Sequence, residues 1–314
     1  MDKKRPSTIS RSIIRMWYLI ALIASAAMPE AILADASPFV YIITSPGSNF
    51  QTQVSNTLIE ELSASDIDAA SVPASEITRL NPDENVIFVT FGDSTSRKIR
   101  QLHSGSPQLN ITYDDEQTES LGANNQSALI LTQPACRQIL FMHKFAPAWK
   151  SIGIITSKKT SKQIDDIKQC VEHHGFVLRI YHVNNEKELI RKLDKAVDEN
   201  DVLMALADTT VYNSRSVKNI LLTAYRHRMP VIGYSNSLVK AGAVAAIYTS
   251  AVNTGKQAAG IIQNYISSNG CFSRRIYTPT EFTVSINRQV ARALDIDLDE
   301  NMNFSDDLDL LEIH

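Results

Sequence analysis

The sequence predicts an α/β protein made of two similar lobes, each built on a parallel sheet. Short apolar runs alternate with amphipathic helical segments, and this alternation fades over residues 103 to 127 and restarts at Pro134. Strands buried on both faces of a parallel sheet appear as continuous apolar runs, and the connections between them are helices. A chain of 314 residues is also long enough for two domains that each bury a core.

The amino-terminal residues 1–36 have the pattern of a secretory signal peptide. Five basic residues precede an apolar run from Met16 to Met28, and small residues around Ala34 and Ala36 follow. The run is too short to span a bilayer, and Pro29 argues against the alternative of an uncleaved anchor. We therefore expect cleavage near Ala34 or Ala36. No cysteine lies at this point to carry a lipid, so a Gram-negative periplasm is the expected location.

The net negative charge of the chain comes from its carboxyl-terminal segment. The full sequence has a net charge of −3, and it becomes −5 without residues 1–36, which hold five bases and three acids. Seven acids fall in residues 297–314, so the body is nearly neutral and neither nucleic acid nor an anionic membrane is an expected partner. This acidic segment has few aromatic residues, which predicts a disordered tail.

The first lobe is expected to start with a strand and a polar loop. The strands are predicted at residues 39–43, 67–72, 86–90 and 109–112, and the helix after the first strand has Val54, Leu58 and Leu62 on one face. The first and third strands end in small hydroxyl residues. Neither loop has a glycine-rich phosphate motif, so no nucleotide cofactor, and indeed no cofactor of any kind, is expected.

The second lobe repeats the pattern after a first crossing near residues 127–132. Strands are predicted at 151–155 and 176–182, and helices at 134–146, 161–173 and 186–197. Beyond residue 250 the chain shows a helix at 254–267, a strand at 281–286 and a short helix at 287–294.

Residues 201–250 carry the most informative pattern. A buried strand at 202–207 ends in the polar turn Asp208 to Thr210, and a helix follows with one apolar stripe and with Asn213 or Ser214 as its cap. Pro230 ends that helix before a strand at 231–233. Ser235 can then cap a short helix that Gly242 ends, before a strand at 243–248.

Ligands of parallel α/β sheets lie outside the carboxyl ends of the strands. The candidate ligand-binding residues therefore lie at or after the ends of the predicted strands: Ser45, Asn49, Thr90, Gly92, Ser94, Asp208, Thr210, Tyr234 and Ser235. Asp208 could accept a hydrogen bond from a ligand amine or hydroxyl. Alternatively, the serines only cap helices. Four aromatic residues could stack on a flat ligand or pack in the core: Phe50, Phe91, Tyr212 and Tyr234.

Catalysis and metal binding are both disfavoured by the motifs. Residues 233–237 nearly match the nucleophile elbow of hydrolases, but Ser237 replaces the final glycine and the only later histidine is His314. The three cysteines allow at most one disulfide and have no metal-ligand spacing. Cys170 is expected to pack on a helix, with the neighbouring histidines solvated. The chain is therefore not expected to be an enzyme or to bind a metal.

The strings in residues 208–243 resemble those of a known family. DTTVYN at 208–213, RMPVIGYS at 228–235 and VKAGA at 239–243 resemble the substrate-binding proteins of ABC transporters, in the subgroup of uncharacterised periplasmic components. A weaker resemblance extends from Phe39 to Ile296. It implies type I periplasmic-binding-protein architecture, in which two Rossmann-like lobes joined by a three-crossing hinge close over a small solute. The implied lobes are 37–128 with 250–279, and 129–249 with 280–296.

The predicted function is therefore periplasmic capture of one small polar ligand by a monomer. An amino-acid-like carboxylate or a neutral solute fits best. No arginine lies at a predicted strand end, and arginine is the residue expected for binding a phosphate or sulfate ester. The expected partner is the membrane permease of an ABC transporter. One alternative is an orphan sensory protein that signals to a membrane receptor, and a weaker one is a periplasmic hydrolase.

Overall fold

The structure is a computed structural model that describes residues 38–80, 85–113, 121, 125–157, 162–298 and 304. The signal peptide expected at residues 1–36 and most of the acidic segment lie outside these residues. Among the residues described, no helix combines the length and apolar character needed to cross a membrane.

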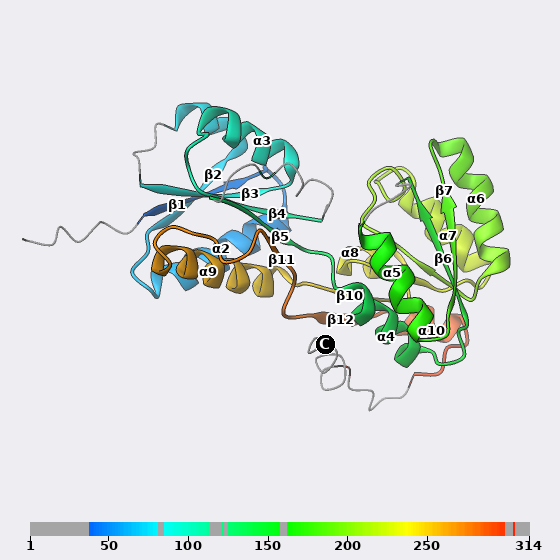
Figure 1. Cartoon of the computed structure of the whole chain (residues 1–314). Helices are drawn as coiled ribbons and strands as arrows, with labels where there is room; N and C mark the ends of the chain where they lie inside the picture. Colours follow the sequence, from blue (N-terminus) through cyan, green and yellow to red (C-terminus); the bar gives the residue numbers. More distant parts are fainter. Residues whose placement is uncertain are drawn as a thin grey trace, which may run out of the picture. The chain divides into compact units, whose positions relative to one another are not determined.

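The first sheet has six parallel strands in the order β11-β5-β4-β3-β1-β2 (Figure 1). They are β1 (Phe39–Thr44), β2 (Ala69–Pro73), β3 (Val86–Phe91), β4 (Gln108–Thr112), β5 (Gln126–Ile130) and β11 (Ile276–Tyr277). The associated helices are α2 (Asn49–Ser63), a short 3-10 helix (Ala74–Arg79), α3 (Asp93–Leu102) and α9 (Ala251–Ser267).

Strand β5 differs from the sequence-based expectation, which put the first crossing between the lobes near residues 127–132. Residues 126–130 are instead a fully buried strand of the first sheet. Gln126 and Ser127 interrupt the apolar pattern, and for this reason the sequence did not predict a strand here. Ser127 is tolerated there because its hydroxyl donates to the backbone carbonyls of Arg274 and Arg275, beside β11.

The second sheet has the order β12-β10-β9-β8-β6-β7, and only β12 is antiparallel to its neighbour. The strands are β6 (Ser151–Thr156), β7 (Val177–His182), β8 (Val202–Met204), β9 (Val231–Gly233), β10 (Ala245–Tyr248) and β12 (Thr283–Ile286). The helices are α4 (Ala135–Phe145), α5 (Lys162–His173), α6 (Glu186–Glu199), α7 (Val217–Arg226), α8 (Asn236–Ala241) and α10 (Arg288–Ala293).

Helix boundaries follow short-range capping chemistry. The Ser235 side chain caps α8, and Gly242 ends that helix with a φ of 126°, as the sequence predicts. Helix α7 starts later than expected: its N-cap is Ser216, while the Asn213 side chain accepts hydrogen bonds from the backbone N–H groups of Arg215 and Ser216. Asn213 therefore organises the turn before the helix rather than capping it directly.

Each lobe has its own core. In the first lobe, Val54, Leu58 and Leu62 of α2 are buried together with β1, β3 and α9. Helices α2 and α9 come very close at Gly255, where a Cβ atom would lie 2.7 Å from the Cβ of Thr57. In the second lobe, two clusters cover opposite faces of the sheet. The prediction of two parallel-dominated α/β lobes is confirmed.

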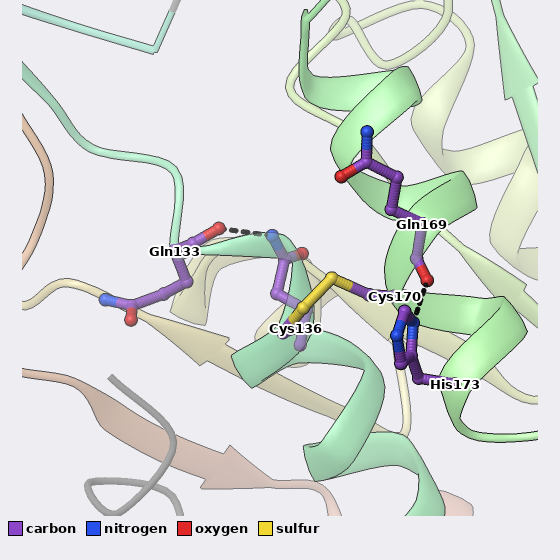
Figure 2. The surroundings of a disulfide bond; sticks show 6 residues. Gln133, Cys136, Gln169, Cys170 and His173 are labelled. Carbon is purple, nitrogen blue, oxygen red and sulfur yellow. Dashed lines mark hydrogen bonds between the residues drawn. A yellow bond between two sulfur atoms is a disulfide. The ribbon is translucent and has the colours of Figure 1, made fainter. Parts of the chain in front are cut away.

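A disulfide joins Cys136 at the start of α4 to Cys170 in α5 (Figure 2). Cys271 is free and exposed. The limit of one disulfide inferred from three cysteines is met. Phe304 is only 7% exposed, and its ring centroid lies 5.0 Å from that of Phe141. At this residue the acidic segment is therefore packed against the second lobe, which its charge pattern did not suggest, because one aromatic side chain can bury area within an otherwise charged run.

Candidate binding site

A cleft of about 1110 Å³ lies at the carboxyl ends of the strands of both sheets. The first lobe contributes residues that follow β1, β3 and β4, and the second lobe contributes residues that follow β6, β8, β9 and β10. These are the positions at which ligands bind to parallel α/β sheets.

Six of the nine candidate residues lie in the wall of this cleft: Asn49, Gly92, Asp208, Thr210, Tyr234 and Ser235. The other three lie elsewhere. Ser45 is exposed, and its backbone N–H donates to Oε1 of Gln51 at 2.6 Å. Ser94 is exposed in the first turn of α3, whose N-cap is Gly92. Thr90 is fully buried within β3.

The burial of Thr90 has a specific cause. Its hydroxyl accepts a hydrogen bond from Nε2 of Gln108 at 2.9 Å and contacts the side-chain amide of Asn110 at 3.0 Å. Three polar side chains on adjacent strands thus satisfy one another inside the first sheet. Strand β3 continues for one further residue, to Phe91, and the cleft begins at that residue rather than at Thr90.

Asp208 is the centre of a hydrogen-bonded turn in the second lobe. Its carboxylate accepts from the hydroxyl of Thr156 at 3.0 Å, the backbone N–H of Ser157 at 2.6 Å and the backbone N–H of Thr210 at 2.9 Å. The Ser157 hydroxyl donates to it as well. Burial opposes the charged form, but these hydrogen bonds outweigh burial and lower the pKa of Asp208.

This arrangement changes the role expected for Asp208. A carboxylate has about four acceptor positions, and four donors of its own lobe already occupy them. Direct contact with a ligand amine or hydroxyl, which the sequence suggested, would have to displace one of these donors. In this structure Asp208 positions the strand-end turns that carry Ser157 and Thr210 to the cleft wall.

Aromatic side chains form an apolar surface in the cleft. The rings of Tyr113 and Tyr234 meet edge to face with centroids 5.8 Å apart, and Tyr212 approaches Tyr234 in the same way at 6.3 Å. Burial and the neighbouring Tyr234 raise the pKa of Tyr113 to about 12, so its hydroxyl stays protonated. Phe50, Phe91 and Tyr234 line the cleft. Tyr212 does not line it and is buried in a hydrophobic cluster of the second lobe.

Four helices begin at the cleft. The N-caps Ser48 of α2, Gly92 of α3, Ser235 of α8 and Ser250 of α9 are all lining residues. A helix start carries a partial positive charge and free backbone N–H groups, which favour anions. Lys240 adds a formal positive charge at the second-lobe wall. On the first-lobe wall, Asp93 is paired with Arg97 and Arg100 at 2.5 and 3.7 Å.

Several lining residues escaped the sequence-based prediction, among them Gln51, Tyr113, Ser157, Lys240 and Tyr248. Three of them could have been found by the rule that located the others, because Tyr113 and Ser157 directly follow β4 and β6 and Tyr248 ends β10. Gln51 and Lys240 lie within helices, so only the packing of α2 and α8 brings them to the cleft.

The described residues contain no group of three or more His, Cys, Asp or Glu side chains that could hold a metal. Ser235, the nucleophile of the near-match hydrolase motif, has its hydroxyl engaged as a cap, accepting from the backbone N–H of Leu238 at 3.4 Å. The cleft wall presents apolar rings, helix starts and the charged side chain of Lys240.

Comparisons with known proteins agree with this reading. The family model described as ABC transporter substrate binding protein matches residues 122–307. No curated protein matches the sequence significantly.

Three solved structures show the same fold. A substrate binding protein with adhesive properties from Clostridium difficile, in a ligand-free, open structure, has a TM-score of 0.69 at 16% identity and covers 85% of this chain and 97% of its own. The ABC domain from Streptococcus pneumonia in complex with L-Trp has a TM-score of 0.63 at 13% identity, covering 83% and 96%. A periplasmic ribose ABC transporter protein from Conexibacter woesei has a TM-score of 0.54 at 12% identity, covering 83% and 96%.

Proposed function

The chain belongs to the family of ABC transporter substrate binding proteins, and from this premise we propose that it captures one small carboxylate with a flat apolar part between its lobes. The observation that carries this proposal is the meeting of four helix starts with aromatic rings in one cleft. The proposed ligand is delivered to the membrane permease of an ABC transporter. The proposed location is the periplasm, in keeping with the secretory pattern of residues 1–36.

The carboxylate preference rests on electrostatics. Helices α2, α3 and α9 are 15, 10 and 17 residues long, so each presents a developed positive end to the cleft. The charge of Lys240 acts in the same direction. The two acids in the wall oppose an anion only weakly, because Asp93 is paired with arginines and the Asp208 charge is spread over four hydrogen bonds.

The flat apolar part follows from the aromatic surface. Phe50, Phe91 and Tyr234 offer ring faces or edges on the two walls, and Tyr113 meets Tyr234 across them. Rings in such edge-to-face pairs are suited to a further ring, which adds favourable contact beyond the buried area alone. An aromatic carboxylate satisfies both features of the cleft, and an amino-acid-like compound is one form of it.

The proposal is tested by native mass spectrometry of protein purified from its own periplasm, followed by thermal unfolding with defined compounds. L-tryptophan, phenylacetate, L-leucine and L-tryptophanamide separate the contributions of ring and carboxylate. At a hundredfold excess over Kd, a ligand stabilises the fold by about 2.7 kcal/mol, which for a domain of this size raises Tm by about 5 to 10 °C.

We expect the aromatic carboxylates to raise Tm and the amide and the aliphatic compound to raise it less. The Lys240→Met variant, which keeps an unbranched side chain of similar length but removes the charge, should reduce the difference between acid and amide. Equal shifts for L-tryptophan and its amide would contradict a carboxylate preference. Retention of a neutral sugar in the native protein would contradict the ligand class altogether.

A further inference from the structure

The chain passes between the two lobes three times in its described part. The first crossing, residues 131–134, links β5 to α4, the second, residues 249–250, links β10 to α9, and the third, residues 278–282, links β11 to β12. Motion of one lobe against the other must bend all three. The contacts among these crossings therefore decide how the lobes can move.

Gln133 in the first crossing bonds to both of the others. Its side-chain Nε2 donates to Oγ1 of Thr249 at 2.8 Å and to the backbone carbonyl of Glu281 at 3.0 Å. The hydroxyl of Thr249 in turn donates to the carbonyl of Leu131 at 3.2 Å. One amide group, on a residue only 3% exposed, thus touches all three crossings.

Arg137, one turn further along in α4, supports this group. Its Nη1 donates to Oε1 of Gln133 at 2.6 Å and to the carbonyl of Pro279 at 3.3 Å, and its guanidinium lies 5.2 Å from the ring centroid of Phe282. The side chain is only 2% exposed. Because Arg137 holds the amide oxygen, the amide nitrogen of Gln133 is directed at Thr249 and Glu281.

The helix that carries Arg137 is itself anchored. Cys136, its neighbour in the sequence, is bonded to Cys170 of α5, and Figure 2 shows Gln133 just before the start of α4 with the disulfide in the first turn. The first turn of α4 therefore moves with the second lobe. Through Arg137 and Gln133 it is connected to the strands that lead to the first lobe.

From this geometry we propose that Gln133 and Arg137 form a clamp that makes the three crossings bend as one hinge. Neither residue lines the cleft, so the pair acts as positioning residues for lobe closure and not as ligand contacts. Its consequence for ligand affinity rests on the proposed binding function. If the crossings fluctuate separately, fewer molecules hold the two cleft walls in the arrangement that binds the ligand, and the apparent affinity falls. The clamp itself can be tested without a ligand.

The first experiment compares hydrogen exchange of ligand-free Gln133→Met with that of Gln138→Met. The two glutamines are close in the sequence and both buried, but the Gln138 amide donates at 2.6 Å to the carbonyl of Gln133 and so connects α4 to the first crossing alone. We expect Gln133→Met to speed exchange about tenfold at residues 249–250 and 278–282, the two crossings it does not belong to. Gln138→Met should leave both at the wild-type rate.

The second experiment measures the distance distribution between the lobes by electron spin resonance. The free Cys271 accepts one nitroxide in the first lobe, and Lys187→Cys on the exposed side of α6 provides the second. A broader distribution in Gln133→Met than in Gln138→Met supports the clamp, whereas a lowered Tm with an unchanged distribution means that Gln133 is only structural.

If Gln133→Met does not fold, Thr249→Val removes the bond between Gln133 and the second crossing with little change of volume. Thr254→Val is its control, because that hydroxyl donates at 2.8 Å to the carbonyl of Ser250 and so bonds to one crossing without joining it to another. The proposal would be overturned if exchange became faster only at residues 131–135, or if no crossing exchanged faster than in the wild type. Because no ligand is used, this outcome is independent of whether the proposed carboxylate ligand is correct.

Discussion

The two walls of the cleft achieve the same placement of polar groups in different ways. In the second lobe, Asp208 is 4% exposed and binds the ends of β6 and β8 together through hydroxyl and backbone donors. In the first lobe, Asp93 lies at the start of α3 and is neutralised by Arg97 and Arg100 along the same helix. The second-lobe wall depends on a buried carboxylate for its shape. The first-lobe wall depends on strand ends and helix caps.

The cores differ in a related way. The first lobe buries its sheet with α2 and α9, which come from opposite ends of the chain. The second lobe completes its core with α10 and with Phe304, which lies beyond the last helix. Late segments of the sequence therefore matter to both lobes, and among the residues that the structure describes, those of the acidic segment that are packed in a core belong to the second lobe.

The largest expected effect is the loss of Phe304. Phe304→Ala should lower the free energy of unfolding by about 3 kcal/mol, because it empties a buried site against Phe141. Phe272→Ala is the matched change in the first lobe, where the ring packs on Tyr265 but is partly exposed, and it should cost less. Urea unfolding measures both. Equal losses would remove the distinction between the two cores.

The next effect concerns the two acids. Asp208→Asn should destabilise the protein by about 2 kcal/mol, because an amide cannot accept from four donors and leaves buried groups unsatisfied. Asp93→Asn should cost less than about 1 kcal/mol, since its partner Arg97 is largely exposed and such pairs contribute little. If the Asp93 variant proves the weaker protein, the proposed difference between the walls is wrong.

The pH dependence sharpens the same comparison. The fold lowers the pKa of Asp208 below its ordinary value of 3.8, so on acidification the unfolded chain takes up this proton first. The stability due to Asp208 is thus fully present above the unfolded pKa and is lost as the pH falls through the folded one. Urea midpoints from about pH 5 to 2.5 should fall less steeply for Asp208→Asn than for the wild type below about pH 4.

A smaller effect than that of Asp208→Asn is expected at Ser235. Ser235→Ala removes the cap of α8 and should cost about 1 kcal/mol, with the fold and cleft retained. Ser235→Asp keeps a capping acceptor and serves as the control in thermal unfolding. No ester or amide hydrolysis should be lost in either variant. Loss of such an activity on the alanine change would reinstate Ser235 as a nucleophile.

Much of the architecture could be predicted because it depends on local pattern. The buried strands of the second lobe, the Ser235 cap and the Gly242 helix end all follow from residues close in the sequence. The missed strand β5 shows the limit of that approach. Its buried Gln126 and Ser127 look like loop residues until their partners on neighbouring segments are known.

The candidate site divides in the same way. The rule that ligands lie at strand ends placed six of the nine candidate residues in the cleft wall. It could not separate them from Thr90, which a buried network with Gln108 holds inside the sheet. Nor could it show that the acceptor positions of Asp208 are filled by donors from its own lobe, since Thr156 and Ser157 lie about fifty residues away.

The sequence by itself determined the alternation of strands and helices, the two lobes and the polar turns from which a site could be built. These features rest on hydrophobic periodicity and on capping, which act over a few residues. Only the tertiary structure decided which turns face the cleft, how Asp208 is satisfied and how Gln133 joins the three crossings. The last two depend on hydrogen bonds between residues 51 to 148 positions apart, and no local pattern encodes such pairings.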